Sequence, residues 1–567
     1  MLASLPKSRD ELLQWTWPQI EPYYKELQAR PLTADTIDEW LADWSRLAEH
    51  ISELREYRYI ATTVNTADTV AQELYANFLD TIQPAAEAAE QKLKEKLLAS
   101  GLEPENFAIP LRNMRSEAAL FREANLPLLA EEDKLTTEYD KITGAQTVLW
   151  EGEEVTLSQL QPVYQEPERS RREQAWRLAS ERWLADRQAI NELWRKLLPL
   201  RRKLADNAGF GNDYRSFRWQ QMLRFDYTPD DCKRFQQAIE GVVVPAATRI
   251  YEKRRQRLGL STLRPWDLDV DPLGRPPLRP FSNVEHLKET ASAIFRNVDP
   301  QLGEYFDIMR REGLLDLENR KNKAPGGYCD EFAASRRPFI FMNAVGLHDD
   351  VQTLLHEGGH AFHVFETRHL PYIQQLEVGM EFAEVASMGM ELLASPYLGR
   401  AHGGFYDEQD AARALIQHLE TSILFWPYMA VVDAFQHWVY ENPDDALDPA
   451  NLDAQWATLW QRFRPGVDWS GLEQEMMTGW QRKLHIHQIP FYYVEYGMAQ
   501  LGAVQVWANA LKDQAAAVAS YRRALALGGT ATLPELYKTA GARFAFDAAT
   551  LRMAINLMEE VINKLGG

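Results

Sequence analysis

The sequence predicts a mainly α-helical protein with strands at only two short places. Apolar residues recur at helical spacing over most of the 567 residues. The stretch 8–125 keeps that spacing without any strand-like run. Strand-like runs separated by turn residues are confined to 147–157 and 327–343. We therefore expect a helical protein that contains one β-hairpin and one small β-sheet.

Composition and charge are those of an ordinary globular protein. Hydrophobic residues make up 45% of the chain and charged residues 25%, with a formal net charge of −20. A nucleic-acid partner is not expected, because phosphate binding needs concentrated Lys and Arg. Cys232 and Cys329 lie far apart, residues 1–15 lack the apolar core of a signal peptide, and no run of 18 apolar residues occurs. We expect a cytoplasmic protein without a membrane partner, as a monomer or a dimer.

The first 206 residues are expected to be helical on both sides of the hairpin at 147–157. Thr33 and Thr36 are suitable caps for a long helix. Its apolar positions are Ile37, Trp40, Leu41, Trp44, Leu47, Ala48, Ile51 and Leu54. Pro84 is expected to break or kink the next helical pattern. Helices then resume at 157 and continue to 206.

The second half begins with a proline-rich loop at 259–280, the clearest loop in the chain. A helix is expected over 283–312. Two short strands, 327–332 and 338–343, follow and are joined by a turn. From 375 to the end the pattern is again helical.

The two strands lead into 349–366, where His356, Glu357 and His360 form the pattern H-E-x-x-H. Residues four apart lie on one face of a helix, roughly 5–6 Å from each other, so both imidazoles can bind one metal ion. Glu357 lies about 100° round the helix from His356 and so stands beside the metal. There it can take a proton from the attacking water.

Gly358 and Gly359 are unexpected inside this helix, because each costs about 1 kcal/mol relative to Ala. Glycine is favoured where another backbone approaches closely. We therefore expect a strand or a bound peptide to contact the helix at these residues.

A catalytic zinc ion needs three protein ligands and one open position. The candidates for the third ligand follow His360 in the sequence: His363, Glu366, Glu377, Glu381, Glu384 and Glu391. His363 shares the helix face of His356, seven residues away, but lacks the glycine turn that would let a third histidine reach the same metal. We expect it to be a packed histidine or one that supports a metal ligand. Spacing alone does not choose among the glutamates.

The motifs around this helix resemble the thimet oligopeptidase and oligoendopeptidase F family of zinc peptidases, the gluzincin type. The likeness is carried by P-F-I-F-M-N at 338–343, by H-E-x-G-H-A at 356–361 and by F-A-E-x-A-S at 382–387. By this resemblance Glu384 is the third ligand of one Zn²⁺ per chain. Ser387 and Glu391 are then expected to orient the metal ligands.

The segment 485–497, H-I-H-Q-I-P-F-Y-Y-V-E-Y-G, offers hydrogen-bond donors. On their own, a histidine and tyrosines are more typical of core packing. The family carries a histidine followed by tyrosines here, which implies that His487 with Tyr493 or Tyr496 stabilises the oxyanion. The choice between the two tyrosines stays open. Pro490-Phe491-Tyr492 is more similar to the oligoendopeptidase F branch.

Substrate contacts are expected from Tyr492, from Phe339 and Phe341, and from Gly326 and Gly327. Phe339 and Phe341 belong to the strand 338–343, which we expect to pair with the substrate backbone as with an added strand.

The resemblance implies a zinc-dependent oligoendopeptidase that cleaves internal bonds of short unfolded peptides. It further implies a deep channel between two lobes, here an N-terminal lobe, 1–200, and a catalytic domain, 201–567. A dipeptidyl carboxypeptidase or metallocarboxypeptidase is the alternative within enzymes, but the sequence identifies no cation for a substrate carboxylate. A non-catalytic peptide-binding protein with structural zinc is a further alternative. Structural zinc usually has four ligands, often cysteines, and no C-x-x-C occurs here.

Overall fold

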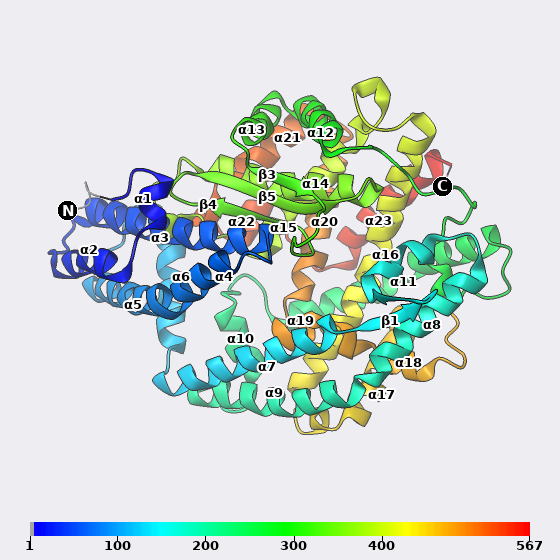
Figure 1. Ribbon diagram of the computed structural model, residues 1–567, viewed down its shortest axis with the longest axis horizontal. Coiled ribbons are helices and arrows are strands. Elements are labelled where there is room, and N and C mark those ends of the chain that lie inside the picture. The colour runs from blue at the N-terminus through cyan, green and yellow to red at the C-terminus, as the bar shows by residue number, and fades with distance from the viewer. Residues whose placement is uncertain (1–4, 567) are drawn as a thin grey trace. The chain divides into compact units, whose positions relative to one another are not determined.

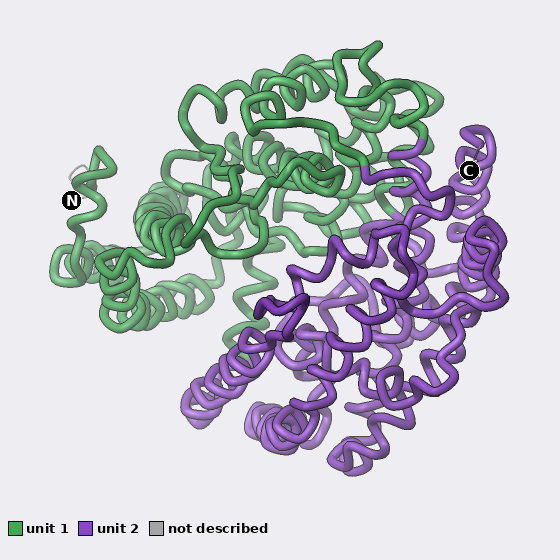
Figure 2. The backbone as a smooth tube through the Cα atoms, turned by 45° about the vertical axis from the view of Figure 1, so that its right-hand side comes forward, with its two compact units in different colours: residues 1–119, 278–412, 502–544 green, residues 120–277, 413–501, 545–567 purple. Residues whose placement is uncertain are grey.

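The computed structural model describes residues 5–566 and is mainly helical (Figure 1). The chain divides into two compact units, each built from three segments (Figure 2). Unit 1 comprises Met1–Ala119, Leu278–Ala412 and Gly502–Phe544, and unit 2 comprises Leu120–Pro277, Arg413–Leu501 and Ala545–Gly567. The functional division at residue 200 is a different partition of the chain and stays a prediction. Among the described residues, no helix combines the length and the apolar character needed to cross a membrane.

The N-terminal segment of unit 1 is helical, as predicted. Its helices are α1 (Arg9–Leu13), α2 (Trp17–Ala29), α3 (Ile37–Val64), α4 (Thr69–Asn77), α5 (Gln83–Ser100) and α6 (Ala108–Leu120). Thr36 is the N-cap of α3, and its tryptophans Trp40 and Trp44 are fully buried in the core that these helices share. Pro84 lies in the first turn of α5, directly after the π-helical turn Phe78–Ile82, so the regular α-helical pattern is interrupted beside it.

A three-stranded sheet occupies the middle segment of unit 1. It consists of β3 (Leu315–Glu318), β4 (Tyr328–Phe332) and β5 (Arg337–Ala344) in the order β3-β5-β4. β5 is parallel to β3 and antiparallel to β4. Because β5 has a neighbour on each side, the prediction that a substrate strand pairs with 338–343 is wrong. Strand β3 was not predicted.

Helices cover both faces of this sheet. Tyr328 and Phe332 point toward α3, where Tyr57 stacks on Phe332 at 4.4 Å between ring centroids and Thr63 Oγ1 lies 2.6 Å from the Tyr328 hydroxyl. The opposite face packs on α14 (His348–Thr367), which in turn packs on α15 (Met380–Ala394). Unit 1 also contains α12 (Val284–Val298), α13 (Pro300–Arg311), α21 (Gln514–Leu525) and α22 (Leu533–Thr539).

Unit 2 contains the predicted hairpin, formed by β1 (Thr147–Trp150) and β2 (Glu153–Thr156). Glu151 and Gly152 both have positive φ, as a two-residue hairpin turn requires. Its helices are α7 (Leu126–Gly144), α8 (Arg169–Ala185), α9 (Arg187–Asn207), α10 (Tyr214–Gln221), α11 (Pro229–Arg257), α17 (Pro449–Phe463), α18 (Glu473–Met477), α19 (Leu484–Gln488) and α23 (Ala548–Lys564). Most of α16 (Glu408–Glu441) and the first half of α20 (Tyr493–Ala510) belong to it as well.

Candidate metal centre and active site

Three side chains of unit 1 form a candidate metal centre. His356 and His360 come from α14 and Glu384 from α15, and their ligand atoms lie within 4.8 Å of one another. Glu384 Oε2 is 3.4 Å from His356 Nε2 and 3.8 Å from His360 Nε2. Ligands at zinc bond lengths in a tetrahedral arrangement stand about 3.3–3.8 Å apart. Two imidazoles and one carboxylate at these separations fit a zinc ion.

The turn that opens α14 is held by the carboxylate of Asp350. Asp350 is the third residue of the helix, and its Oδ2 accepts hydrogen bonds from the backbone N–H groups of Val345 and Leu347 at 2.9 and 2.8 Å. The carboxylate therefore fixes the chain that leaves β5 and sets where the helix starts.

The two glycines explain how α14 meets its neighbours. A Cβ on Gly359 would stand 2.3 Å from the carbonyl oxygen of Ala386 and 2.6 Å from Cα of Ser387, both in α15. A Cβ on Gly358 would stand 2.6 Å from the ring of Phe295. The expected close approach of another backbone is therefore real at Gly359, but the partner is a helix. This contact brings Glu384, one turn before Ser387, against the histidines.

Hydrogen bonds orient two of the three candidate ligands. The Nδ1–H of His356 donates to Glu391 Oε1 at 2.6 Å, which leaves Nε2 as the nitrogen turned toward Glu384. Ser387 Oγ donates to Glu384 Oε2 at 2.9 Å. Burial lowers the pKa of His360 to about 4, so its imidazole is neutral and can bind a metal ion.

Glu357 is buried but is not a member of the metal-binding group. Burial first, and then the charges of Glu384 and Asp330 against that of His356, raise the pKa of Glu357 to about 7. Glu357 in turn raises the pKa of the Cys329 thiol, second to the effect of burial. Because Cys329 belongs to β4, the Glu357 carboxylate lies on the side of α14 that faces this edge strand.

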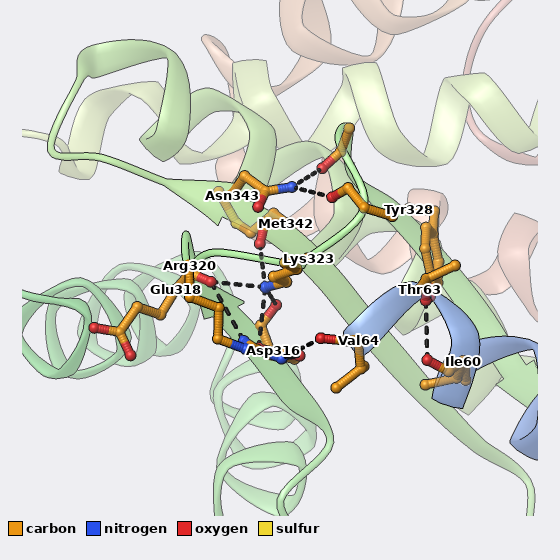
Figure 3. A network of polar contacts seen from close by, with 12 residues as sticks. Ile60, Thr63, Val64, Asp316, Glu318, Arg320, Lys323, Tyr328, Met342 and Asn343 are labelled. Atoms are coloured by element: carbon orange, nitrogen blue, oxygen red, sulfur yellow. Dashed lines mark hydrogen bonds and ion pairs between the residues drawn. The ribbon is translucent and has the colours of Figure 1, made fainter. Parts of the chain in front are cut away.

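A polar network holds the loop that leads into β4 (Figure 3). Lys323 Nζ donates to Asp316 Oδ1 at 3.0 Å and to the carbonyl of Met342 at 2.6 Å. Asn343 Nδ2 donates to the carbonyls of Ala324 and Gly326 at 2.8 and 2.9 Å. These hydrogen bonds hold the backbone at the exposed residues Gly326 and Gly327.

The predicted substrate-binding residues of this region divide into two kinds. Gly326 and Gly327 are exposed, and Gly326 has a φ of +97°. A Cβ on Gly327 would contact Thr353 of α14 at 3.4 Å, so this glycine lies against the helix of the metal centre. Phe339 and Phe341 are buried, the latter completely, in an apolar cluster. Because both rings pack inside this cluster, substrate binding by the two phenylalanines stays a prediction.

The predicted histidine and tyrosines all lie in unit 2, and the structure groups the tyrosines with a different histidine. The ring of His485 lies 5.8, 5.0 and 6.1 Å from those of Tyr492, Tyr493 and Tyr496. Burial, and then the charge of Lys483, lower the pKa of His485 to about 4.

His487, the histidine chosen from the sequence, has no exposed surface. Its ring stacks on Tyr139 at 4.3 Å and on Trp480 at 5.7 Å. Both histidines belong to the short helix α19, where residues two apart do not share a face. The two-residue spacing of the histidines in the sequence therefore already indicates that only one of them can face the tyrosines.

Comparisons with known proteins identify the family. A model described as peptidase family M3 matches residues 163–554, and one described as the peptidase M3 N-terminal domain matches residues 12–106. Oligopeptidase PepF of Bacillus subtilis (strain 168) is 26% identical over 331 residues, which cover 57% of this chain and 47% of that protein. An oligoendopeptidase F homolog of Mycoplasma pneumoniae is 24% identical over 302 residues, 50% of this chain and 47% of that protein. These alignments span about half the length of the curated relatives.

A solved structure extends the likeness over the whole chain. PZ peptidase A with inhibitor 2 is 27% identical, with a TM-score of 0.86 over 100% of this chain and 99% of that one. The resemblance inferred from the motifs, including the oligoendopeptidase F branch, is confirmed by these matches. The chain belongs to peptidase family M3.

Proposed function

We propose that this protein is a zinc-dependent oligoendopeptidase that hydrolyses internal bonds of short, unfolded peptides. The observation that carries the proposal is the group formed by His356, His360 and Glu384, with the carboxylate of Glu357 beside the group and outside it. The names of the relatives, oligopeptidase and oligoendopeptidase, agree with this chemistry.

The residues that would hold one zinc ion are His356 and His360, through Nε2, and Glu384. Zinc held there supplies a Lewis acid for the scissile carbonyl and makes water nucleophilic at neutral pH. Glu391 keeps His356 in the tautomer that presents Nε2, and Ser387 keeps the Glu384 carboxylate in place.

Glu357 is the general base in this proposal. Its carboxylate takes the proton of the attacking water and then gives it to the leaving amine. The family resemblance calls for donors to the oxyanion from 485–497. We assign that role to His485 with Tyr493 or Tyr496, in place of His487, because the ring of His485 is the one in contact with the tyrosines.

Substrate recognition is proposed at β4 in place of β5. Within the described residues no strand pairs with the outer edge of β4. An extended peptide can add to such an edge through main-chain hydrogen bonds. Gly326 and Gly327 precede β4 without side chains that would obstruct the approach. Most backbone groups of a folded protein are already paired within it, which favours unfolded substrates.

The test compares casein with a ten-residue peptide, each incubated with the purified enzyme. The predicted channel admits peptides of about 5–20 residues, from about 3.3 Å per extended residue and a depth of tens of ångströms. We expect the peptide to be cut internally and casein to survive. Equal cleavage of both would contradict the size limit and leave the metal chemistry intact.

Mass spectrometry of the products from one unblocked and one C-terminally amidated peptide separates an endopeptidase from a carboxypeptidase, since only the latter depends on the terminal carboxylate.

A further inference from the structure

A second group of metal-ligand residues lies in unit 2. Cys232 is in the first turn of α11, and Asp433 and His437 are one turn apart on one face of α16. Their ligand atoms lie within 4.8 Å of one another, the same limit that the group on α14 and α15 meets. Relative exposure is 0% for Cys232, 0% for Asp433 and 2% for His437. The group is therefore sealed inside the unit.

The polar atoms of this group are incompletely satisfied. Asp433 Oδ1 and His437 Nε2 have no hydrogen-bond partner. Asp433 Oδ2 accepts a bond from Gln236 Nε2 at 2.6 Å. His437 Nδ1 lies 3.4 Å from Arg215 Nη1, an atom that also pairs with Glu441 at a shorter distance. A buried carboxylate with an unused oxygen is costly unless a cation compensates it.

The distance between Asp433 and His437 shows whether the two side chains form a hydrogen bond or are spaced as ligands of one metal ion. His437 Nε2 is 3.6 Å from Asp433 Oδ2, which is too long for a hydrogen bond. It falls between the 3.4 and 3.8 Å that separate the imidazole nitrogens from Glu384 in the other group. Both sets match the separation of about 3.3–3.8 Å expected of neighbouring zinc ligands.

The donor set also points to zinc. A thiolate, an imidazole and a carboxylate suit Zn²⁺, whereas Mg²⁺ and Ca²⁺ prefer oxygen ligands alone. A nucleophilic role for Cys232 needs access for a substrate, which complete burial denies.

We propose that Cys232, Asp433 and His437 bind a second Zn²⁺ that links α11 to α16 and takes no part in hydrolysis. The metal content of the protein is then two per chain, one more than the sequence motifs predict. The amide of Gln236 donates to Asp433 Oδ2 and so helps to orient that carboxylate.

The same turn of α16 supports the segment that carries the tyrosines. Gln436 Oε1 accepts a hydrogen bond from the backbone N–H of Phe491 at 2.8 Å. The ring of His437 lies 5.2 Å from that of Phe491, a residue held at a φ of +68°. A metal ion that fixes His437 therefore stabilises the strained residue directly before Tyr492.

Cobalt spectroscopy tests the proposal on the full chain. Among the described residues, the group on α14 and α15 contains no sulfur, so a thiolate-to-cobalt charge-transfer band in the near ultraviolet reports the group at Cys232. We expect protein reconstituted with Co²⁺ to show this band. It should be lost in Cys232→Ser and retained in Cys329→Ser, which removes the other thiol. This measurement on the unaltered protein does not depend on the folding of a variant.

Metal analysis gives the matching stoichiometry after reconstitution with Zn²⁺ and removal of excess. We expect two zinc ions in the unaltered protein, one in Cys232→Ser or His437→Asn, and one in His360→Ala. A single zinc ion that His360→Ala removes entirely, together with no charge-transfer band, overturns the proposal. A band that disappears in Cys329→Ser and persists in Cys232→Ser also overturns it.

Discussion

Glu391 accepts a 2.6 Å hydrogen bond from Nδ1 of His356 and thereby sets which nitrogen of that imidazole faces Glu384. Partners of this kind typically change metal affinity by 10–100-fold when they are removed. We expect Glu391→Gln to weaken zinc binding at the α14–α15 group by about that factor, measured by competition with a chelator. Glu366→Gln is the matched control, because Glu366 lies on α14 but pairs with Arg522. Unchanged affinity in Glu391→Gln would show that the hydrogen bond does not orient the ligand.

Variants of Glu357 and Glu384 should have different effects, because we propose that the first is the general base and the second a metal ligand. Glu357→Gln is expected to retain zinc at the α14–α15 group while kcat falls by about 10²–10⁴-fold or more, because general-base catalysis is lost. Glu384→Gln is expected to lose zinc from the same group. Metal analysis and kinetics on the two variants measure both effects. Loss of zinc from Glu357→Gln would overturn its assignment as the base.

A methyl group added at Gly359 is expected to disturb the candidate metal centre. Gly359→Ala places Cβ 2.3 Å from the backbone of α15, so the helices must separate, at a cost of about 1–3 kcal/mol or more. We expect a lower free energy of unfolding and weaker zinc binding. Gly241→Ala is the control, since Gly241 lies within α11 and a Cβ there meets nothing within 4 Å. That variant should gain about 0.5–1 kcal/mol from the helical preference of alanine. Equal effects on zinc affinity would contradict the role of Gly359.

The two histidines of α19 should behave differently. His485→Phe is expected to lower kcat by about 10²–10³-fold with little change in KM, if its donor acts only in the transition state. His487→Phe should chiefly lower the melting temperature, because this ring lies between Tyr139 and Trp480. The reverse pattern would return the catalytic role to His487.

Tyr493→Phe and Tyr496→Phe distinguish the remaining oxyanion donor. The true donor should lose about 10²–10³-fold in kcat with KM nearly constant. Wild-type kcat in both variants would mean that neither hydroxyl stabilises the oxyanion.

Glu331 of β4 makes stability depend on pH. Burial, opposed by Arg336 and reinforced by Glu49 and Glu53, raises the pKa of Glu331 to about 7. The folded state then holds a proton that the unfolded chain releases near its ordinary pKa of about 4.3. Stability from this group is therefore present at low pH and lost as pH rises through 7. Glu331→Gln should be more stable relative to the unaltered protein at pH 8 than at pH 5, as urea denaturation can measure. An equal difference at both values would contradict the shifted pKa.

Features that depend on residues close in sequence could be predicted from it. The helix of 349–366, its two histidines and the position of Glu357 follow from spacing within one helix. The hairpin at 147–157 likewise has a local cause, the turn at Glu151 and Gly152.

Features that depend on residues far apart in the sequence could not be predicted from it. Glu384 could not be separated from Glu377, Glu381 and Glu391 by spacing, because the contact of Gly359 with α15 decides which carboxylate meets the histidines. Strand β3 has four residues and gains its identity from pairing in parallel with β5. The choice between His485 and His487 depends on Tyr139, more than 300 residues earlier in the chain.

The division of each unit into three chain segments has a consequence for folding during synthesis. Unit 1 needs residues up to Phe544, and α15 is braced by late residues: the Tyr521 hydroxyl donates to Ala386 O at 2.6 Å and the Tyr537 hydroxyl to Glu381 O at 2.8 Å. The ribosome will have released the helix of the metal centre long before these tyrosines are made. Glu384 therefore gains its final support only when the chain is nearly complete, so a truncated or stalled product carries the H-E-x-x-H motif without a rigidly held Glu384.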